Sequence, residues 1–262
     1  FQAFPIAKAA GFPVVGTSTT AEGVTAIGPT VFRVALAESQ AIPPTVAKVQ
    51  AAWHAKSVAI IYGDDNAFTK TDFTVFNDEL KKRGVQIVDV ETYHTKDVDF
   101  QAQLTKIKAA NPEVVVVGSL FDEATKIIAQ ATKLGLKTHM MGGNGLNSPK
   151  MVDASGPGAV GSVVGAAWFI DNNYTGNKAF VERYKKKFGI LPDQFAAQSY
   201  AAAQVVGQLA KEGMSTPREV CDGLKNLRVA HTVLGPIAFD ANRDVKSAPV
   251  ILKIVPGGFA YF

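Results

Sequence analysis

Hydroxyl, amide and aromatic side chains follow several predicted strands of this chain, and they are suited to binding a small molecule. The segments are Gly16-Thr-Ser-Thr-Thr20, Gly63-Asp-Asp-Asn-Ala-Phe68, Gly118-Ser-Leu-Phe121 and Gly142-Gly-Asn-Gly-Leu146. Hydroxyls and backbone N–H groups can donate to a carboxylate, while Phe68 and Phe121 offer flat apolar surface. Ordinary turn chemistry explains any one of these loops. Compatible chemistry in all of them favours a small-molecule pocket.

The residues that could carry out catalysis or hold a metal form no convincing set. Asp64 and Asp65 are adjacent in a turn and point in different directions, so helix capping or loop acidity explains them better than acid–base catalysis. Ser18 is not part of a G-x-S-x-G nucleophile elbow. The histidines, which are scattered and lack the i,i+4 spacing of a zinc pair, are His54, His94, His139 and His231. We therefore expect no catalytic residue and no bound metal.

A glycine motif at Gly156-Pro-Gly-Ala-Val-Gly161 matches the dinucleotide-binding pattern G-x-G-x-x-G. That fingerprint requires a strand, the glycine turn and then a helix, because the helix N-terminus holds the pyrophosphate. Here the motif follows a helix-like stretch and opens a strand between Ser162 and Phe169. We expect a turn at this position and no nucleotide cofactor.

The elements that position these residues alternate regularly between strand and helix. Short apolar runs begin at residues 58, 85, 113 and 138, which are 27, 28 and 25 residues apart. Between the runs, apolar residues recur at helical spacing, as at Phe73, Phe76 and Leu80. This rhythm predicts an α/β fold in which a parallel sheet is covered on both faces by helices.

The two ends of the chain depart from this rhythm. A strand at residues 12–16 reads as the middle of a sheet, yet no strand precedes it, which predicts that an N-terminal part is missing. Helices are expected near 177–188, 194–212 and 217–226, with strands near 236–240 and 249–255. A capping box of Thr216 and Glu219 should start the last of these helices.

Composition excludes several classes of protein. The chain has 262 residues, 47% hydrophobic and 19% charged, which is typical of a folded globular protein. A net charge of +4 is mild, and the basic run Lys185-Lys-Lys187 reads as a solvated helix face, so we expect no nucleic-acid partner. The single Cys221 forbids an internal disulfide. No apolar run approaches the length of a membrane span.

An ordered set of segments resembles the branched-chain amino acid (Leu/Ile/Val) binding family, the substrate-binding proteins of ABC transporters. The segments are Pro5-Ile-Ala-Lys-Ala-Ala-Gly-Phe-Pro-Val-Val15, Thr20-Ala-Glu-Gly-Val-Thr-Ala-Ile-Gly-Pro-Thr-Val-Phe-Arg33, Ile60-Ile-Tyr-Gly-Asp-Asp65, Gly135-Leu-Lys-Thr138, Met141-Gly-Gly-Asn-Gly145, Phe180-Val-Glu-Arg-Tyr-Lys-Lys-Lys-Phe-Gly189 and Leu234-Gly-Pro-Ile-Ala-Phe-Asp240. The resemblance spans the whole chain, and it is specific as an ordered set.

The resemblance implies the type I periplasmic-binding-protein fold, an α/β architecture of two lobes that close on a ligand. Lobe I would comprise residues 1–33 and 169–233, and lobe II residues 34–168 and 234–262. Family members begin with several βα units of lobe I that have no counterpart here. The resemblance therefore implies that the N-terminal part of lobe I is missing and that a complementary N-terminal fragment is a partner.

The resemblance also assigns ligand-binding positions. The loop of Ser18, Thr19 and Thr20 falls where the family holds the ligand's carboxylate. Ala67 occupies a position where the family often has Tyr, and Phe68 lies beside it. The family's aromatic residue at the next strand end is matched by Phe121, or by Leu120 in a shifted register. Ser119 lies in that same loop. Amino-acid binders carry an acid at the position of Asn144, where it pairs with the α-ammonium group.

The amide at Asn144 implies a ligand that has a carboxylate and no α-amine, because a neutral amide forgoes a charge-assisted hydrogen bond of about 1.5–3 kcal/mol. We expect a non-enzymatic protein that captures a small organic acid, an aromatic carboxylate, without cofactors, and presents it to a membrane-bound ABC permease. Its location would be the periplasm or an extracellular lipid anchor. The alternatives are branched-chain amino acid binding and a ligand-sensing domain of a receptor or regulator.

Overall fold

The computed structural model describes residues 2–262, which divide into two compact units. Within the described residues, unit 1 comprises residues 2–37 and Ala167–Ala248, and unit 2 comprises Glu38–Ala166 and Pro249–Phe262. The segment 234–248 belongs to unit 1, whereas we expected it in lobe II. The physical reason is packing: Leu234, Ile237 and Val245 are buried in the same apolar cluster as Phe32.

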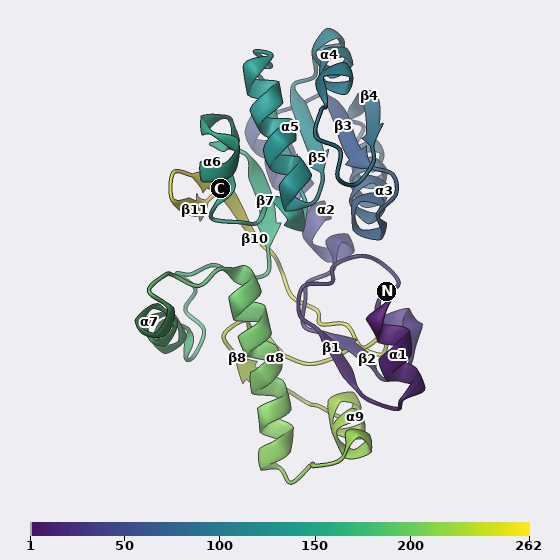
Figure 1. Cartoon of the computed structure of the whole chain (residues 1–262), viewed down its shortest axis with the longest axis vertical. Coiled ribbons are helices and arrows are strands. Elements are labelled where there is room, and N and C mark those ends of the chain that lie inside the picture. The colour runs from purple at the N-terminus through teal and green to yellow at the C-terminus, as the bar shows by residue number, and fades with distance from the viewer. Residues whose placement is uncertain (1) are drawn as a thin grey trace. The chain divides into compact units, whose positions relative to one another are not determined.

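Unit 2 is built on a seven-stranded sheet with the order β11-β10-β7-β6-β5-β3-β4 (Figure 1). The strands are β3 (Ser57–Gly63), β4 (Gln86–Tyr93), β5 (Val114–Gly118), β6 (His139–Gly142), β7 (Val163–Ala166), β10 (Val250–Val255) and β11 (Gly258–Tyr261). The central strands pair in parallel, which confirms the predicted α/β class. The β7–β10 and β10–β11 pairs of this sheet are antiparallel, so β10 runs against both of its neighbours.

Helices cover both faces of this sheet. They are α2 (Glu38–Trp53), α3 (Ala67–Lys82), α4 (Gln101–Ala110), α5 (Phe121–Lys133) and the short α6 (Met151–Ser155). Alternate strand residues such as Val58 and Ile60 pack against Phe76 of α3 and Ile42 of α2. The intervening residues point to the opposite face because successive side chains of a strand alternate. Helix α5 is drawn in teal in Figure 1. Its buried residues include Ile127.

Unit 1 has little sheet and more helix. Its elements are α1 (Ala3–Ala9), β1 (Val14–Gly16), the 3-10 turn η1 (Thr25–Ile27), β2 (Val31–Arg33), α7 (Asn177–Phe188), α8 (Gln194–Lys211), α9 (Pro217–Lys225), β8 (Ala230–Thr232) and β9 (Gly235–Ile237). β1 and β2 form a two-stranded parallel sheet, and β8 and β9 form a hairpin. The capping box of Thr216 and Glu219 is confirmed at the start of α9.

The glycine motif lies in the predicted context. After α6 ends at Ser155, the chain makes a 3-10 turn, η3 (Pro157–Ala159), and then enters β7. Gly158 packs so closely on α5 that a Cβ atom there would lie 1.8 Å from the Thr132 hydroxyl. These glycines therefore serve a turn and a close helix contact, and no helix follows them to hold a pyrophosphate.

Candidate functional site

The predicted carboxylate loop follows β1 in unit 1. Ser18 and Thr19 are partly buried and Thr20 is 4% exposed. The hydroxyl oxygens of Thr19 and Thr20 are both buried, and neither has a hydrogen-bond partner among residues 2–262. Gly16 allows this arrangement, because a Cβ atom there would lie 2.3 Å from the Thr19 hydroxyl. The loop thus holds two buried donors that a ligand oxygen could satisfy.

The other predicted residues follow strands of unit 2. Ala67 and Phe68 begin α3, whose N-cap is Asn66: its side-chain oxygen accepts from the Phe68 N–H at 2.9 Å. Ser119 is fully buried just after β5, and Phe121 is the first residue of α5. Asn144 opens the 3-10 turn η2 (Asn144–Leu146) after β6, and its backbone N–H donates to Glu38 at 3.1 Å.

The sheet brings these unit 2 residues to one edge. β3, β5 and β6 are parallel neighbours, with Tyr62 paired to Gly118 and Val117 paired to Gly142. Because parallel strands end at the same edge of a sheet, the loops that carry Phe68, Ser119 and Asn144 lie side by side, at the edge where α/β proteins bind ligands. The three hydroxyl residues of the carboxylate loop belong to unit 1.

A buried carboxyl group behind this edge was not predicted. Asp72 of α3 is completely buried, and its carboxylate oxygens have no hydrogen-bond partner among the described residues. It packs directly against the backbone of Gly143, where a Cβ atom would lie 2.5 Å from both oxygens. Burial, together with the charge of Glu38, raises the pKa of Asp72 well above its ordinary value. The signal in the sequence was an acid on the apolar stripe of α3.

Tyr93 also lies behind this edge, at the end of β4, and is 4% exposed. Burial raises the pKa of its hydroxyl above the ordinary value. Tyr93 therefore stays neutral over the physiological pH range. The Asp72 carboxyl and the Tyr93 hydroxyl thus both favour their protonated forms, and both lie behind the loops that bear the predicted ligand residues.

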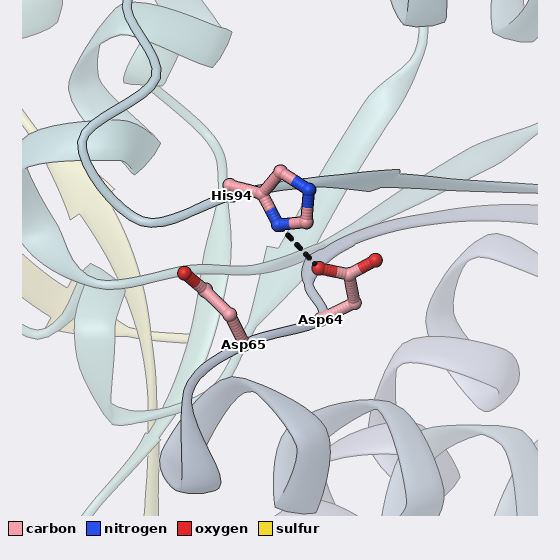
Figure 2. Close-up of side chains that lie close together, drawn as sticks. All are labelled: Asp64, Asp65 and His94. Atoms are coloured by element: carbon pink, nitrogen blue, oxygen red, sulfur yellow. Dashed lines mark ion pairs between the residues drawn. The ribbon is translucent and has the colours of Figure 1, made fainter.

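Asp64, Asp65 and His94 gather at the ends of β3 and β4 (Figure 2), where one ligand atom from each lies within 4.8 Å of the others. The Nδ1 atom of His94 lies 2.9 Å from Asp64, and Asp65 accepts hydrogen bonds from the N–H and hydroxyl of Thr95. These bonds lower the pKa of Asp65. Asp65 and His94 are exposed and Asp64 is partly buried, and their contacts join the loops that follow β3 and β4. Asn66 caps α3, so neither aspartate of the pair caps this helix.

None of the helices within residues 2–262 is both long enough and apolar enough to span a bilayer.

Comparison with known proteins identifies the family of this chain. The sequence profile of the periplasmic binding protein family matches residues 1–253. A Leu/Ile/Val-binding protein homologue of Brucella suis is 32% identical over 174 residues, covering 64% of this chain and 46% of that protein. The Leu/Ile/Val/Thr-binding protein of Salmonella typhimurium is 29% identical over 189 residues, covering 72% and 51%. The chain thus spans about half the length of the curated relatives it matches.

Solved structures show the same fold. A leucine-binding protein from Thermotoga maritima superposes with a TM-score of 0.90 at 23% identity, covering 98% of this chain and 74% of that one. A benzoate complex of a solute-binding protein from R. palustris gives a TM-score of 0.87 at 21% identity, covering 98% and 72%. The fold is the α/β type I periplasmic-binding-protein fold, as the sequence predicted. From the family profile and these relatives, the chain belongs to the periplasmic binding protein family.

Proposed function

We propose that this chain belongs to a solute-binding protein of an ABC transporter that captures a small aromatic carboxylate and performs no chemistry. The observation that carries the proposal is the pair of buried, unpartnered hydroxyls at Thr19 and Thr20, which suit a carboxylate ligand. In unit 2 the proposed ligand-binding residues are Ala67, Phe68, Ser119, Phe121 and Asn144.

The ligand class rests on Asn144 and on the aromatic residues. A neutral amide at Asn144 supplies no negative charge to an α-ammonium group, and Phe68 and Phe121 begin helices at neighbouring strand ends. Ring–ring contacts add about 0.5–1.5 kcal/mol beyond the burial of area. Two such contacts would favour an aromatic acid over an aliphatic one by about tenfold or more. Relatives named for leucine and for benzoate both share this fold.

Isothermal titration calorimetry tests the ligand class. The chain is titrated with benzoate, 4-hydroxybenzoate, leucine, isoleucine and valine, and the aromatic acids should bind most tightly. Asn144→Glu should weaken benzoate about tenfold or more, because it sets a second negative charge beside the carboxylate. Asn144→Gln is the matched control, since Gln has the size of Glu without its charge. Tightest binding of leucine by the unaltered chain would establish the alternative, branched-chain amino acid binding, and no binding of any of them would reject both.

Three further parts of the proposal concern partners and location. The partners would be a membrane-bound ABC permease and a complementary N-terminal segment, and the location would be the periplasm, as the family name indicates. Support for a strand partner comes from β1, which pairs only with β2 among residues 2–262 and so leaves one edge open to strand addition. A monodisperse monomer of the chain with slowly exchanging β1 amides would count against that partner.

A further inference from the structure

Arg33 holds the backbone of the predicted carboxylate loop. Arg33 is the last residue of β2 and pairs with Gly16, the last residue of β1. It is 3% exposed. Its NH1 group donates to the carbonyl oxygens of Thr19, at 3.1 Å, and Ala21, at 2.7 Å. A buried guanidinium is tolerated only where its donors find acceptors. In Arg33, two of these acceptors belong to the loop itself.

Asp244 fixes the other side of the same guanidinium. Nε of Arg33 donates to Oδ1 of Asp244, and NH2 donates to Oδ2 at 3.1 Å, which makes the pair bidentate. Asp244 is held in turn, because its backbone N–H donates to the Asp240 side chain at 3.1 Å and its Oδ2 accepts from the Thr25 hydroxyl at 3.4 Å. The orientation of Arg33 is therefore set from both sides.

This arrangement leaves the loop's other polar groups available. Because the carbonyls of Thr19 and Ala21 face the guanidinium, they are already satisfied, whereas the hydroxyls of Thr19 and Thr20 are buried without partners among residues 2–262. Burying such donors unpaired is unfavourable. A ligand carboxylate could accept from both without requiring the loop to reorganise.

We propose that Arg33, anchored by Asp244, is the positioning residue that preorganises the Ser18-Thr19-Thr20 loop for a carboxylate. Its charge is neutralised by Asp244, so it acts through geometry and does not touch the ligand. Preorganisation raises affinity because the loop is ordered before binding. Lysine cannot replace it, since an ammonium lacks the planar fork that reaches two carbonyls and a carboxylate together. This inference rests on the proposed function of the loop but holds for any carboxylate ligand, leucine included.

The test compares Arg33→Lys with the unaltered chain by calorimetry, using benzoate and its uncharged isostere benzamide, or leucine and leucinamide if leucine is the tighter ligand. We expect Arg33→Lys and Asp244→Asn to reduce the ratio of carboxylate affinity to amide affinity at least tenfold. A purely structural role would weaken both ligands by the same factor, and that outcome would overturn the proposal.

Hydrogen exchange provides a readout that needs no ligand. Amides of residues 18–21 should exchange at least tenfold faster in Arg33→Lys, and unchanged exchange there would reject a positioning role even if the chain binds carboxylates. Arg243→Lys is the matched control: Arg243 lies in the turn beside Asp244 but donates to the carbonyls of Val31, at 3.2 Å, and Thr25, at 2.8 Å. It should leave the affinity ratio and loop exchange unchanged. If the unaltered chain binds no carboxylate while Arg33→Lys still speeds exchange, the proposed function fails and the positioning role stands.

Discussion

Asp72 is a carboxyl group on the buried face of α3, two turns before Leu80 of the unit 2 core. Water does not reach it, and no described residue donates a hydrogen bond to it, so ionisation is opposed both by burial and by the charge of Glu38. A carboxyl group in this position favours its protonated form. Below its raised pKa, Asp72 is thus an uncharged carboxyl group packed behind the Gly143 backbone.

The pKa of Asp72 predicts how stability depends on pH. The folded state holds a proton that the unfolded state releases near pH 4, so the free energy of unfolding falls as the pH rises from about 4 towards the raised pKa. Asp72→Asn removes the titrating group and should therefore raise the melting temperature at pH 8 relative to the unaltered chain. A gain of about 2–4 °C is expected for each kcal/mol.

Melting curves between pH 4 and pH 8 measure this effect. The gain from Asp72→Asn should shrink towards pH 4, because the unfolded state also takes up the proton as the pH approaches the ordinary pKa of aspartate. Asp78→Asn is the matched control, because Asp78 is an exposed aspartate of the same helix. An Asp72→Asn gain that is equal at both ends of the range would show that the pKa of Asp72 is not raised by folding.

The sequence predicted the residues at strand ends but not the residues that support them. Phe68, Ser119 and Asn144 could be placed because each follows an apolar run at a spacing that parallel strands impose. Arg33 could not, because its partner Asp244 lies 211 residues further along the chain. Such a pairing depends on tertiary structure and leaves no periodic pattern in the sequence.

At the scale of elements, the contact of α3 with the loop after β6 is tight enough to demand glycine. Gly143 has φ −81° and ψ −159°, a conformation that alanine adopts freely, so only space restricts this position. A Cβ atom would meet the Asp72 carboxylate at 2.5 Å. The packing of α3 against the loop after β6 thus leaves no room for one additional carbon atom at Gly143.

Gly143→Ala should therefore destabilise the chain by about 1–3 kcal/mol, the range for overpacking a core. In an Asp72→Ala background the penalty should fall, because the carboxylate that clashes is gone. Urea unfolding of the double-mutant cycle measures this coupling. Gly207→Ala is a contrasting control: Gly207 lies within α8 with nothing near its Cβ position, so alanine there should stabilise the helix by up to about 1 kcal/mol. Equal penalties for Gly143→Ala in both backgrounds would contradict the proposed clash.

Elements with strong local signals were predicted and the others were not. β3, β5 and β6 have dense apolar runs, and α9 has its capping box, so their positions follow from local sequence. The helix α2 contains Pro43 and Pro44, residues that normally interrupt a helix, and tertiary packing of Ile42 and Val46 overrides that preference. β2 has only three residues, too few for an alternating pattern to show.

At the scale of the whole molecule, each unit has an apolar core of its own. The unit 1 core surrounds Phe32 and Leu209, and the unit 2 core surrounds Phe76 and Leu80. The chain passes between the units after Ala37, Ala166 and Ala248. Since separate cores are separate sources of stability, local unfolding of one unit need not open the other.

Matched leucine truncations test that independence. Leu80→Ala and Leu209→Ala each remove the same side chain from a site that is 1% exposed, which should cost about 2–5 kcal/mol in the affected unit. Leu80→Ala should then accelerate hydrogen exchange in β3 and β5 and leave α8 unchanged, because α8 draws its protection from the unit 1 core. Leu209→Ala should do the reverse. Mass spectrometry of peptides from the two units resolves these patterns, and equal acceleration in both units by either variant would show that the chain opens as one cooperative body.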